Sequence, residues 1–293
     1  MVQLRLRGER LGPVPGGIAA VLFDKDGTMS HSEPMLLALA EARVRHCLQL
    51  VDDQLQADRH HQLEDLLRRA YGLEEEGVHP AGTTAVAARD HNLISTATSL
   101  SQMGLGWPEA LAIAEAVFAQ TDALHGDSGP RPPQPTEGLA DLLDALLEAD
   151  VGCAVISNDD ERGIRGFLRR HGFERHVQGL WSAGHHPRKP DPGAVHGLCA
   201  ALAVDPARCV LIGDANSDLR MGRRAGLALV LGYRAGWRRP VPLDPSFPQI
   251  DHWRELSLAV DAGPDPGSGP GPGPDPCPDP DVAAATWDRT ARE

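Results

Sequence analysis

Short apolar runs alternate with amphipathic stretches along much of the chain. The pattern is clearest in the second half, where each apolar run is followed by a segment with helical spacing of its apolar residues. Short apolar runs bounded by turn residues predict buried strands, and the segments between them predict helices. Strands that alternate with helices in this way predict a parallel α/β sheet. Buried strands are expected at residues 18–23, 151–156, 177–181, 209–212 and 227–231.

The pattern changes between residues 30 and 135, where no strand-like alternation is found. Apolar residues here recur at helical spacing. A helical block of about a hundred residues is large enough for a small core of its own. We therefore expect a helical lobe inserted into the α/β part, which the chain leaves through a Gly/Pro-rich linker at 126–135. Helices are expected at residues 34–50, 54–71, 83–103 and 108–124.

The two ends of the chain have patterns of their own. Residues 2–7 alternate apolar and polar positions and predict an edge strand ahead of the first buried strand. Residues 263–280 alternate Pro with Gly, Asp and Ser, which removes backbone donors and offers no apolar face. The expected division is a discontinuous α/β core at 1–29 and 136–260, a helical domain at 30–135 and a disordered tail at 261–293.

The composition narrows the function classes. A net charge of −13 argues against binding to nucleic acid or to a membrane surface, both of which need clustered Lys and Arg. No apolar run could span a bilayer and the N-terminus has no signal-peptide core, so we expect a cytoplasmic protein. The five cysteines are scattered, which favours neither disulfides nor a zinc site. Lys25 and Lys189 are the only lysines in the sequence, and arginine supplies the other basic residues. Lysine at these two positions indicates a need for a compact ammonium group, and chance is the alternative explanation.

Two carboxylates separated by one residue directly follow the first buried strand. Asp24 and Asp26 lie between the apolar run and Gly27, so we expect them on the loop past the carboxyl end of that strand. Ligands bind at this edge of open parallel sheets. Two acids this close need a cation between them or a retained proton, which favours a metal site or a nucleophile beside a general acid. An Asx-type turn is the alternative interpretation.

Three further polar groups follow later strand-like runs. Ser157 and Asn158 come after one of them, and a hydroxyl there can donate a hydrogen bond without adding charge. Asp214 and Asp218, four residues apart, come after another. Lys189 precedes the expected start of a helix. Each has a structural alternative, which is a turn for the Ser-Asn pair, helix capping for the acids and a solvated surface for the lysine.

Residues 23–28, FDKDGT, resemble the first motif of the haloacid dehalogenase superfamily, whose commonest members are Mg²⁺-dependent phosphatases. Ser157 with Asn158 resembles the second motif, Lys189 the third, and residues 212–218, IGDANSD, the fourth. The resemblance implies an α/β fold, a Rossmann-like doubly wound parallel sheet with an inserted all-helical cap domain. Members with this cap mostly act on small phosphate esters, and phosphoglycolate phosphatase is the nearest in style.

The resemblance also implies a chemical role for each matched residue. Asp24 is expected to attack phosphorus and become an aspartyl phosphate, while Asp26 protonates the leaving alkoxide and then deprotonates water. Ser157, the Asn158 amide and Lys189 are expected to bind the phosphoryl group. The expected substrate is a small phosphorylated metabolite, phosphoglycolate-like or a sugar phosphate.

Mg²⁺ is the cofactor that the resemblance implies. Its expected ligands are the Asp24 carboxylate, the Asp26 backbone carbonyl and Asp214, with Asp218 behind a bound water. This metal would neutralise the phosphoryl oxygens during transfer.

Single residues argue for or against several rival functions within the superfamily. Asp26 disfavours dehalogenation, since dehalogenating members lack the second acid. The absence of lysine between Lys25 and Lys189 excludes the phosphonate-cleaving chemistry, which needs a cap lysine. A phosphomutase or a pyrophosphatase of the same superfamily remains an alternative, as does a catalytically silent binding module. Arg89 could reach a substrate carboxylate or a second anion, and His31 could line the entrance to the site, although a solvated surface arginine and a loop histidine are the plainer interpretations. The sequence indicates no oligomeric state.

Overall fold

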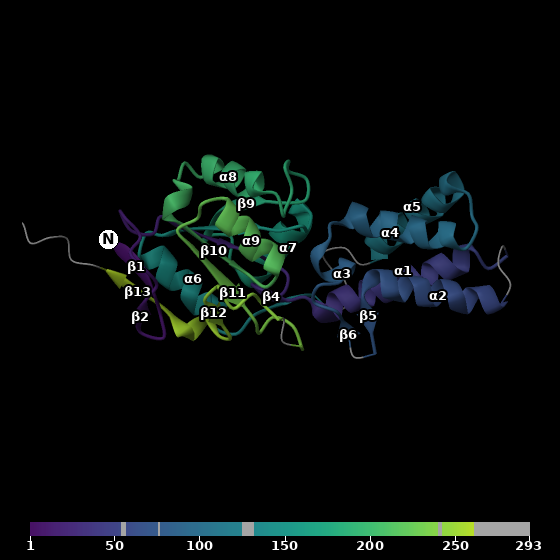
Figure 1. Cartoon of the computed structure of the whole chain (residues 1–293), viewed down its shortest axis with the longest axis horizontal. Coiled ribbons are helices and arrows are strands. Elements are labelled where there is room, and N and C mark those ends of the chain that lie inside the picture. Colours follow the sequence, from purple (N-terminus) through teal and green to yellow (C-terminus); the bar gives the residue numbers. More distant parts are fainter. Residues whose placement is uncertain (54–56, 76, 125–131, 240–241, 261–293) are drawn as a thin grey trace, which may run out of the picture. The chain divides into compact units, whose positions relative to one another are not determined.

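A computed structural model describes residues 1–53, 57–75, 77–124, 132–239 and 242–260 of the 293. A six-stranded sheet in the order β12-β11-β10-β3-β8-β9 lies within the α/β part, and each neighbouring pair is parallel (Figure 1). The parallel α/β sheet expected from the sequence is thereby confirmed. Its strands are β3 (Ala20–Phe23), β8 (Gly152–Ile156), β9 (Val177–Trp181), β10 (Cys209–Gly213), β11 (Leu229–Tyr233) and β12 (Gln249–Ile250).

Helices cover both faces of this sheet, as the central strand β3 requires. Val21 and Phe23 pack into one hydrophobic cluster, together with residues of α6 and α7. Ala20 and Leu22 pack into another, together with residues of α8 and α9. Successive side chains of a strand point to opposite faces, so a strand that is buried throughout needs cover on both. The helices are α6 (Leu139–Glu148), α7 (Glu161–His171), α8 (Pro192–Ala201) and α9 (Asn216–Arg224).

The N-terminal strand lies outside the central sheet. β1 (Val2–Leu6) pairs antiparallel with β13 (Leu256–Val260) on one side and with β2 (Glu9–Arg10) on the other. The expectation of an edge strand was therefore wrong, because β1 is the middle strand of a separate three-stranded sheet. Its partner β13 comes from residues 256–260, which the sequence pattern did not mark as a strand.

Between β3 and α6 the chain forms a helical insertion, called the cap below. The cap has a hydrophobic core of its own, to which Val44, Leu67, Leu100 and Phe118 contribute from four helices. The inserted helical cap is thus confirmed, with one short hairpin, β5 (Leu73–Glu74) and β6 (Gly77–Val78), added to its helices. The helices are α1 (Glu33–Leu50), α2 (Ala57–Tyr71), α3 (Thr83–Val86), α4 (Arg89–Gln102) and α5 (Trp107–Leu124).

The single helix expected at 83–103 was wrong, because the chain breaks it into α3 and α4. Ala87 and Ala88 are extended, with ψ of 150° and 161°. The buried Asn92 side chain supports the break, since its Nδ2 donates to the carbonyl oxygens of Thr83 at 3.0 Å and of Ala87 and Ala88 at 3.3 Å. A side chain that bonds backbone groups in this way competes with the helix.

The chain enters and leaves the cap through one short ladder. β4 (Ser30–His31) pairs antiparallel with β7 (Gln134–Pro135), at the limits expected for the helical domain. The domain boundaries stay a prediction. The tail at 261–293 and residues 126–131 of the linker lie outside the described residues. Among the helices that are described, none has the length and apolar character needed to cross a membrane.

Candidate active site

Polar residues follow three neighbouring strands at one edge of the sheet. β3 is level with both neighbours, since Phe23 pairs with Ile212 of β10 and with Val155 of β8. Parallel strands end at the same edge of a sheet, so the residues just past these three strands lie close together. The residues that the sequence places after the first, second and fourth buried runs are therefore brought to one place.

Three buried carboxylates form a cluster at this edge, called the acid cluster below. Asp24, Asp214 and Asp218 each offer one oxygen, and these oxygens lie within 4.8 Å of one another. Burial raises the pKa of Asp24 to about 6, although Lys189 opposes the shift. Burial, followed by the charges of Asp24 and Asp218, raises the pKa of Asp214 well above its usual range. An all-oxygen set of crowded acids fits a hard divalent cation such as Mg²⁺.

Lys189 reaches the same cluster from the loop before α8. Its Nζ donates to Asp24 Oδ1 at 2.6 Å and to the Ile156 carbonyl at 3.3 Å, and lies 2.9 Å from Asp218 Oδ1. Burial alone would lower the pKa of Lys189, but the carboxylates of Asp218 and Asp24 outweigh burial and hold that pKa above its ordinary value. The structure therefore brings a buried ammonium into contact with two of the three acids.

The Asp26 carboxylate belongs to a second polar group, called the Lys25 clasp below, which consists of Lys25, Asp26, Asp159 and Ser32. Lys25 Nζ lies 2.6 Å from Asp26 Oδ1 and 3.0 Å from Asp159 Oδ2, and Ser32 Oγ donates to the same Asp26 oxygen. Burial would lower the pKa of Lys25, but Asp159 and Asp26 outweigh it and raise that pKa. Ser32 and Asp159 were not identified from the sequence. The rarity of lysine in the sequence was the only observation that drew attention to Lys25.

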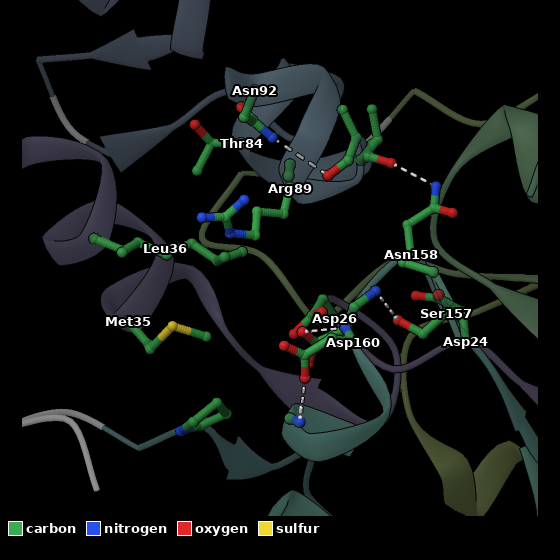
Figure 2. A pocket seen from close by; sticks show the side chains of 18 of the residues that line it. Asp24, Asp26, Met35, Leu36, Thr84, Arg89, Asn92, Ser157, Asn158 and Asp160 are labelled. Atoms are coloured by element: carbon green, nitrogen blue, oxygen red, sulfur yellow. Dashed lines mark hydrogen bonds between the residues drawn. The ribbon is translucent and has the colours of Figure 1, made fainter. Parts of the chain in front are cut away.

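Ser157 and Asn158 take different positions at the end of β8. Ser157 is buried and its Oγ accepts a hydrogen bond from the Asp159 backbone at 3.1 Å. The Asn158 side chain points to the cap, where its Nδ2 donates to the Val86 carbonyl at 2.9 Å (Figure 2). The Asn158 side chain therefore joins the end of β8 to the break between α3 and α4, while its backbone amide stays beside Ser157.

Trp237 is a neighbour of the acid cluster that the sequence did not indicate. Its indole Nε1 donates to Asp214 Oδ2 at 2.6 Å, and Thr28 Oγ1 donates to Asp214 Oδ1 at 3.3 Å. Gly27, with a φ of +80°, allows this approach, since a Cβ there would lie 2.1 Å from the indole nitrogen. Both oxygens of Asp214 are therefore fixed by donors from outside the cluster.

A cavity of about 530 Å³ is lined by residues of both the core and the cap. Asp24 and Lys189 line it from the core, and Arg89 lines it from the first turn of α4 (Figure 2). Among the described residues that line the cavity, Arg89 is present and His31 is not. His31 is exposed instead, with its Nδ1 3.3 Å from the Gly236 carbonyl oxygen.

Comparison with known proteins adds sequence relatives to this geometry. Residues 18–226 match the family model described as haloacid dehalogenase-like hydrolase. The chain is 28% identical over 244 residues to N-acetylmuramic acid 6-phosphate phosphatase of Pseudomonas aeruginosa, covering 82% of this chain and 93% of the relative. It is 26% identical over 235 residues to phosphoglycolate phosphatase of Photobacterium profundum, covering 80% and 91%.

A solved structure shares the fold. The chain superposes on a predicted phosphoglycolate phosphatase from Haemophilus somnus 129pt with a TM-score of 0.57 and 17% identity. The superposition covers 79% of this chain and 93% of that one. At this level of identity the likeness describes the fold alone.

Proposed function

The chain belongs to the haloacid dehalogenase-like hydrolases, and we propose that it is a phosphatase that hydrolyses a small phosphate monoester through an aspartyl phosphate. The observation that carries this proposal is the setting of Asp24. It is a buried carboxylate at the carboxyl edge of the sheet, it lines the cavity, and it is bound by a buried ammonium. The two relatives named above span most of the chain and are phosphatases, which supports the same class.

Asp24 is the nucleophile in this proposal. A carboxylate oxygen attacks phosphorus, the bond from phosphorus to the ester oxygen breaks, and its electron pair leaves with the alkoxide. Lys189 holds Asp24 Oδ1 at 2.6 Å and offsets the negative charge that builds up on the phosphoryl oxygens. Ser157 and the Asn158 backbone amide follow β8, the strand next to β3, and complete the group that binds the phosphoryl oxygens.

Asp26 is the general acid and then the general base. It gives its proton to the leaving alkoxide, and the resulting carboxylate removes a proton from the water that attacks the aspartyl phosphate. Attack by this water releases inorganic phosphate and restores Asp24. Lys25 and Ser32 both bind Asp26 at Oδ1, so we assign the proton transfers to Oδ2.

The acid cluster would hold the divalent cation, which we propose is Mg²⁺. Asp24, Asp214 and the Asp26 backbone carbonyl would be direct ligands, and Asp218 would bind through water. When bound, the ion would neutralise phosphoryl oxygens. Burial first, and the neighbouring carboxylates second, raise the pKa of Asp24 and Asp214, and a bound cation would offset both effects by stabilising the ionised acids.

The test is phosphate release from a panel of phosphate esters. The panel contains phosphoglycolate, N-acetylmuramic acid 6-phosphate, sugar phosphates, nucleotides and pyrophosphate, assayed with Mg²⁺ and again with EDTA. We expect release that EDTA abolishes, and a loss of at least about 10³-fold in Asp24→Asn. Asp141→Asn, on the exposed side of α6, is the matched control and should keep wild-type activity.

Three outcomes would contradict the proposal. Folded protein that releases no phosphate from any ester would favour a binding module without catalysis. Release from pyrophosphate alone, or isomerisation of a sugar phosphate without release, would favour the pyrophosphatase or the phosphomutase. Near-native activity of Asp24→Asn would rule out the covalent mechanism.

A further inference from the structure

Two arginines of the cap meet on the wall of the cavity, and we call them the cap arginine pair. Arg43 comes from α1 and Arg89 from the start of α4, and both line the cavity. Both face Asp122 of α5, with Arg89 Nε 2.6 Å from Oδ2 and Arg43 Nη2 3.7 Å from Oδ1. Both guanidinium groups also lie over the Phe118 ring, at 3.9 Å for Arg43 and 5.2 Å for Arg89. Two cations thus share one carboxylate.

Arg43 is a buried guanidinium with one nitrogen that no hydrogen-bond partner satisfies among the described residues. Its side chain is 6% exposed, and its Nε has no hydrogen-bond partner among the described residues. Within the described part of the chain its ion-pair partner is Asp122, and the distance of 3.7 Å is longer than a hydrogen bond. Buried polar groups are nearly always satisfied, so the unpartnered Nε of this buried arginine indicates an incomplete anion site.

Two further buried polar atoms on the same wall have no partner within the described structure. They are Thr84 Oγ1 and Asn92 Oδ1, and both residues line the cavity beside Arg89 (Figure 2). The Thr84 hydroxyl can donate to an anion, and the Asn92 oxygen can accept from a hydroxyl or N–H group. This wall therefore offers a set of unpartnered polar atoms to which a bound molecule could hydrogen-bond.

The charges of the cap arginine pair and Asp122 favour one kind of anion. These three side chains together carry one net positive charge, which matches a singly charged carboxylate. A phosphate group carries about −1.5 to −2 at pH 7 and would leave the site negative. A guanidinium also binds the two oxygens of a carboxylate side by side, which a compact ammonium cannot do.

We propose that the cap arginine pair binds a carboxylate of the substrate, so that the enzyme prefers phosphate esters of small hydroxy acids. The proposal rests on the phosphatase function proposed above. The phosphoryl group of the substrate then lies at Asp24, and its carboxylate binds to the cap arginine pair. Asp122 competes with the substrate for Arg89, and its carboxylate neutralises part of the charge of the two arginines when no substrate is bound.

The test compares each acid with its neutral amide. The probes are phosphorylated hydroxy acids of increasing chain length, starting from phosphoglycolate, the carboxamide of each, and bisphosphates of the same length. The wild type should prefer an acid to its amide. In Arg89→Gln, kcat/KM for that acid should fall about 10- to 100-fold, mainly through KM, while the amide changes less than about twofold.

Two more variants separate recognition from damage to the fold. Asp122→Asn removes the competing carboxylate and should lower KM for the acid about two- to fivefold, the opposite direction to Arg89→Gln. Arg45→Gln, on an exposed position of the same helix as Arg43, should change neither substrate.

Failure of this inference can be told from failure of the phosphatase proposal. Equal losses on acid and amide in Arg89→Gln would overturn the carboxylate site while leaving the phosphatase in place. A preference for the bisphosphate over the acid would assign the pair to a second phosphate instead. A wild type that releases no phosphate from any probe would overturn the phosphatase proposal itself.

Discussion

Replacing Trp237 by Phe should weaken binding of the proposed Mg²⁺ without removing any of its proposed ligands. The indole Nε1 donates to Asp214 Oδ2 at 2.6 Å, and both side chains are almost fully buried. Phenylalanine keeps most of the apolar packing of Trp237 against the sheet but has no N–H. The substitution therefore removes one hydrogen bond to a buried carboxylate and leaves its oxygen without that donor.

The size of the effect follows from this one hydrogen bond. A hydrogen bond to a charged group contributes about 1.5–3 kcal/mol, and the loss of such an outer partner typically reduces metal affinity about 10- to 100-fold. The indole also lowers the pKa of Asp214 against the raising effect of burial. Without it that pKa rises further, so protons compete better with the metal, and the loss should be larger at pH 6 than at pH 8.

Calorimetric titration with Mg²⁺ measures the affinity directly, and phosphate release at increasing Mg²⁺ measures its effect on turnover. We expect a weaker Mg²⁺ affinity in Trp237→Phe and a kcat near wild type at saturating Mg²⁺. Thr28→Val, which loses a longer bond of 3.3 Å to the same carboxylate, should show a smaller effect. Trp107→Phe is the control, since Trp107 is 47% exposed at the start of α5. An unchanged affinity in Trp237→Phe, or a loss of kcat that Mg²⁺ cannot restore, would refute the reasoning.

Two other predictions concern the same edge of the sheet. Lys25→Met should lower kcat about 10- to 100-fold with little change in KM, because Asp26 loses the ammonium at 2.6 Å that orients it. Steady-state kinetics measures both constants, and a change in KM alone would contradict this prediction. Mg²⁺ should raise the Tm more at pH 7.5 than at pH 5. With a folded pKa of about 6, the contribution of Asp24 to stability is present at low pH and is lost as pH rises through that value, so the cation has more repulsion to relieve at pH 7.5. Equal shifts at both pH values in differential scanning fluorimetry would count against it.

Much of the fold could be predicted because its signals are local. Five of the six central strands were indicated by apolar runs of the right length, and the rule that parallel strands end at one edge then placed Asp24, Asp214 and Ser157 together. The sixth strand, β12, has two residues, which is too short to leave a pattern. The break between α3 and α4 was also invisible, because it depends on the Asn92 side chain turning back onto its own backbone.

The partners of the site residues could not be predicted because they are tertiary contacts. Trp237 reaches Asp214 from a loop beyond β11, and no spacing in the sequence relates the two residues. Arg43 and Arg89 lie on different helices, and it is the packing of α1 and α4 against α5 that brings both to Asp122. Helical spacing identifies the buried face of a helix, but it cannot say which polar residues of several helices converge.

The two lysines show how a compositional signal acquires a physical reason. Each is buried and lies between two carboxylates, Lys25 between Asp26 and Asp159, and Lys189 between Asp24 and Asp218. A planar guanidinium with five donors would need more partners than a pocket between two acids offers, whereas a compact ammonium is satisfied there. Arginine is found instead on the cap wall, where its planar guanidinium could donate two parallel hydrogen bonds to a carboxylate. The distribution of Lys and Arg therefore separates the group that holds the acids of the proposed chemistry from the group that would recognise the substrate.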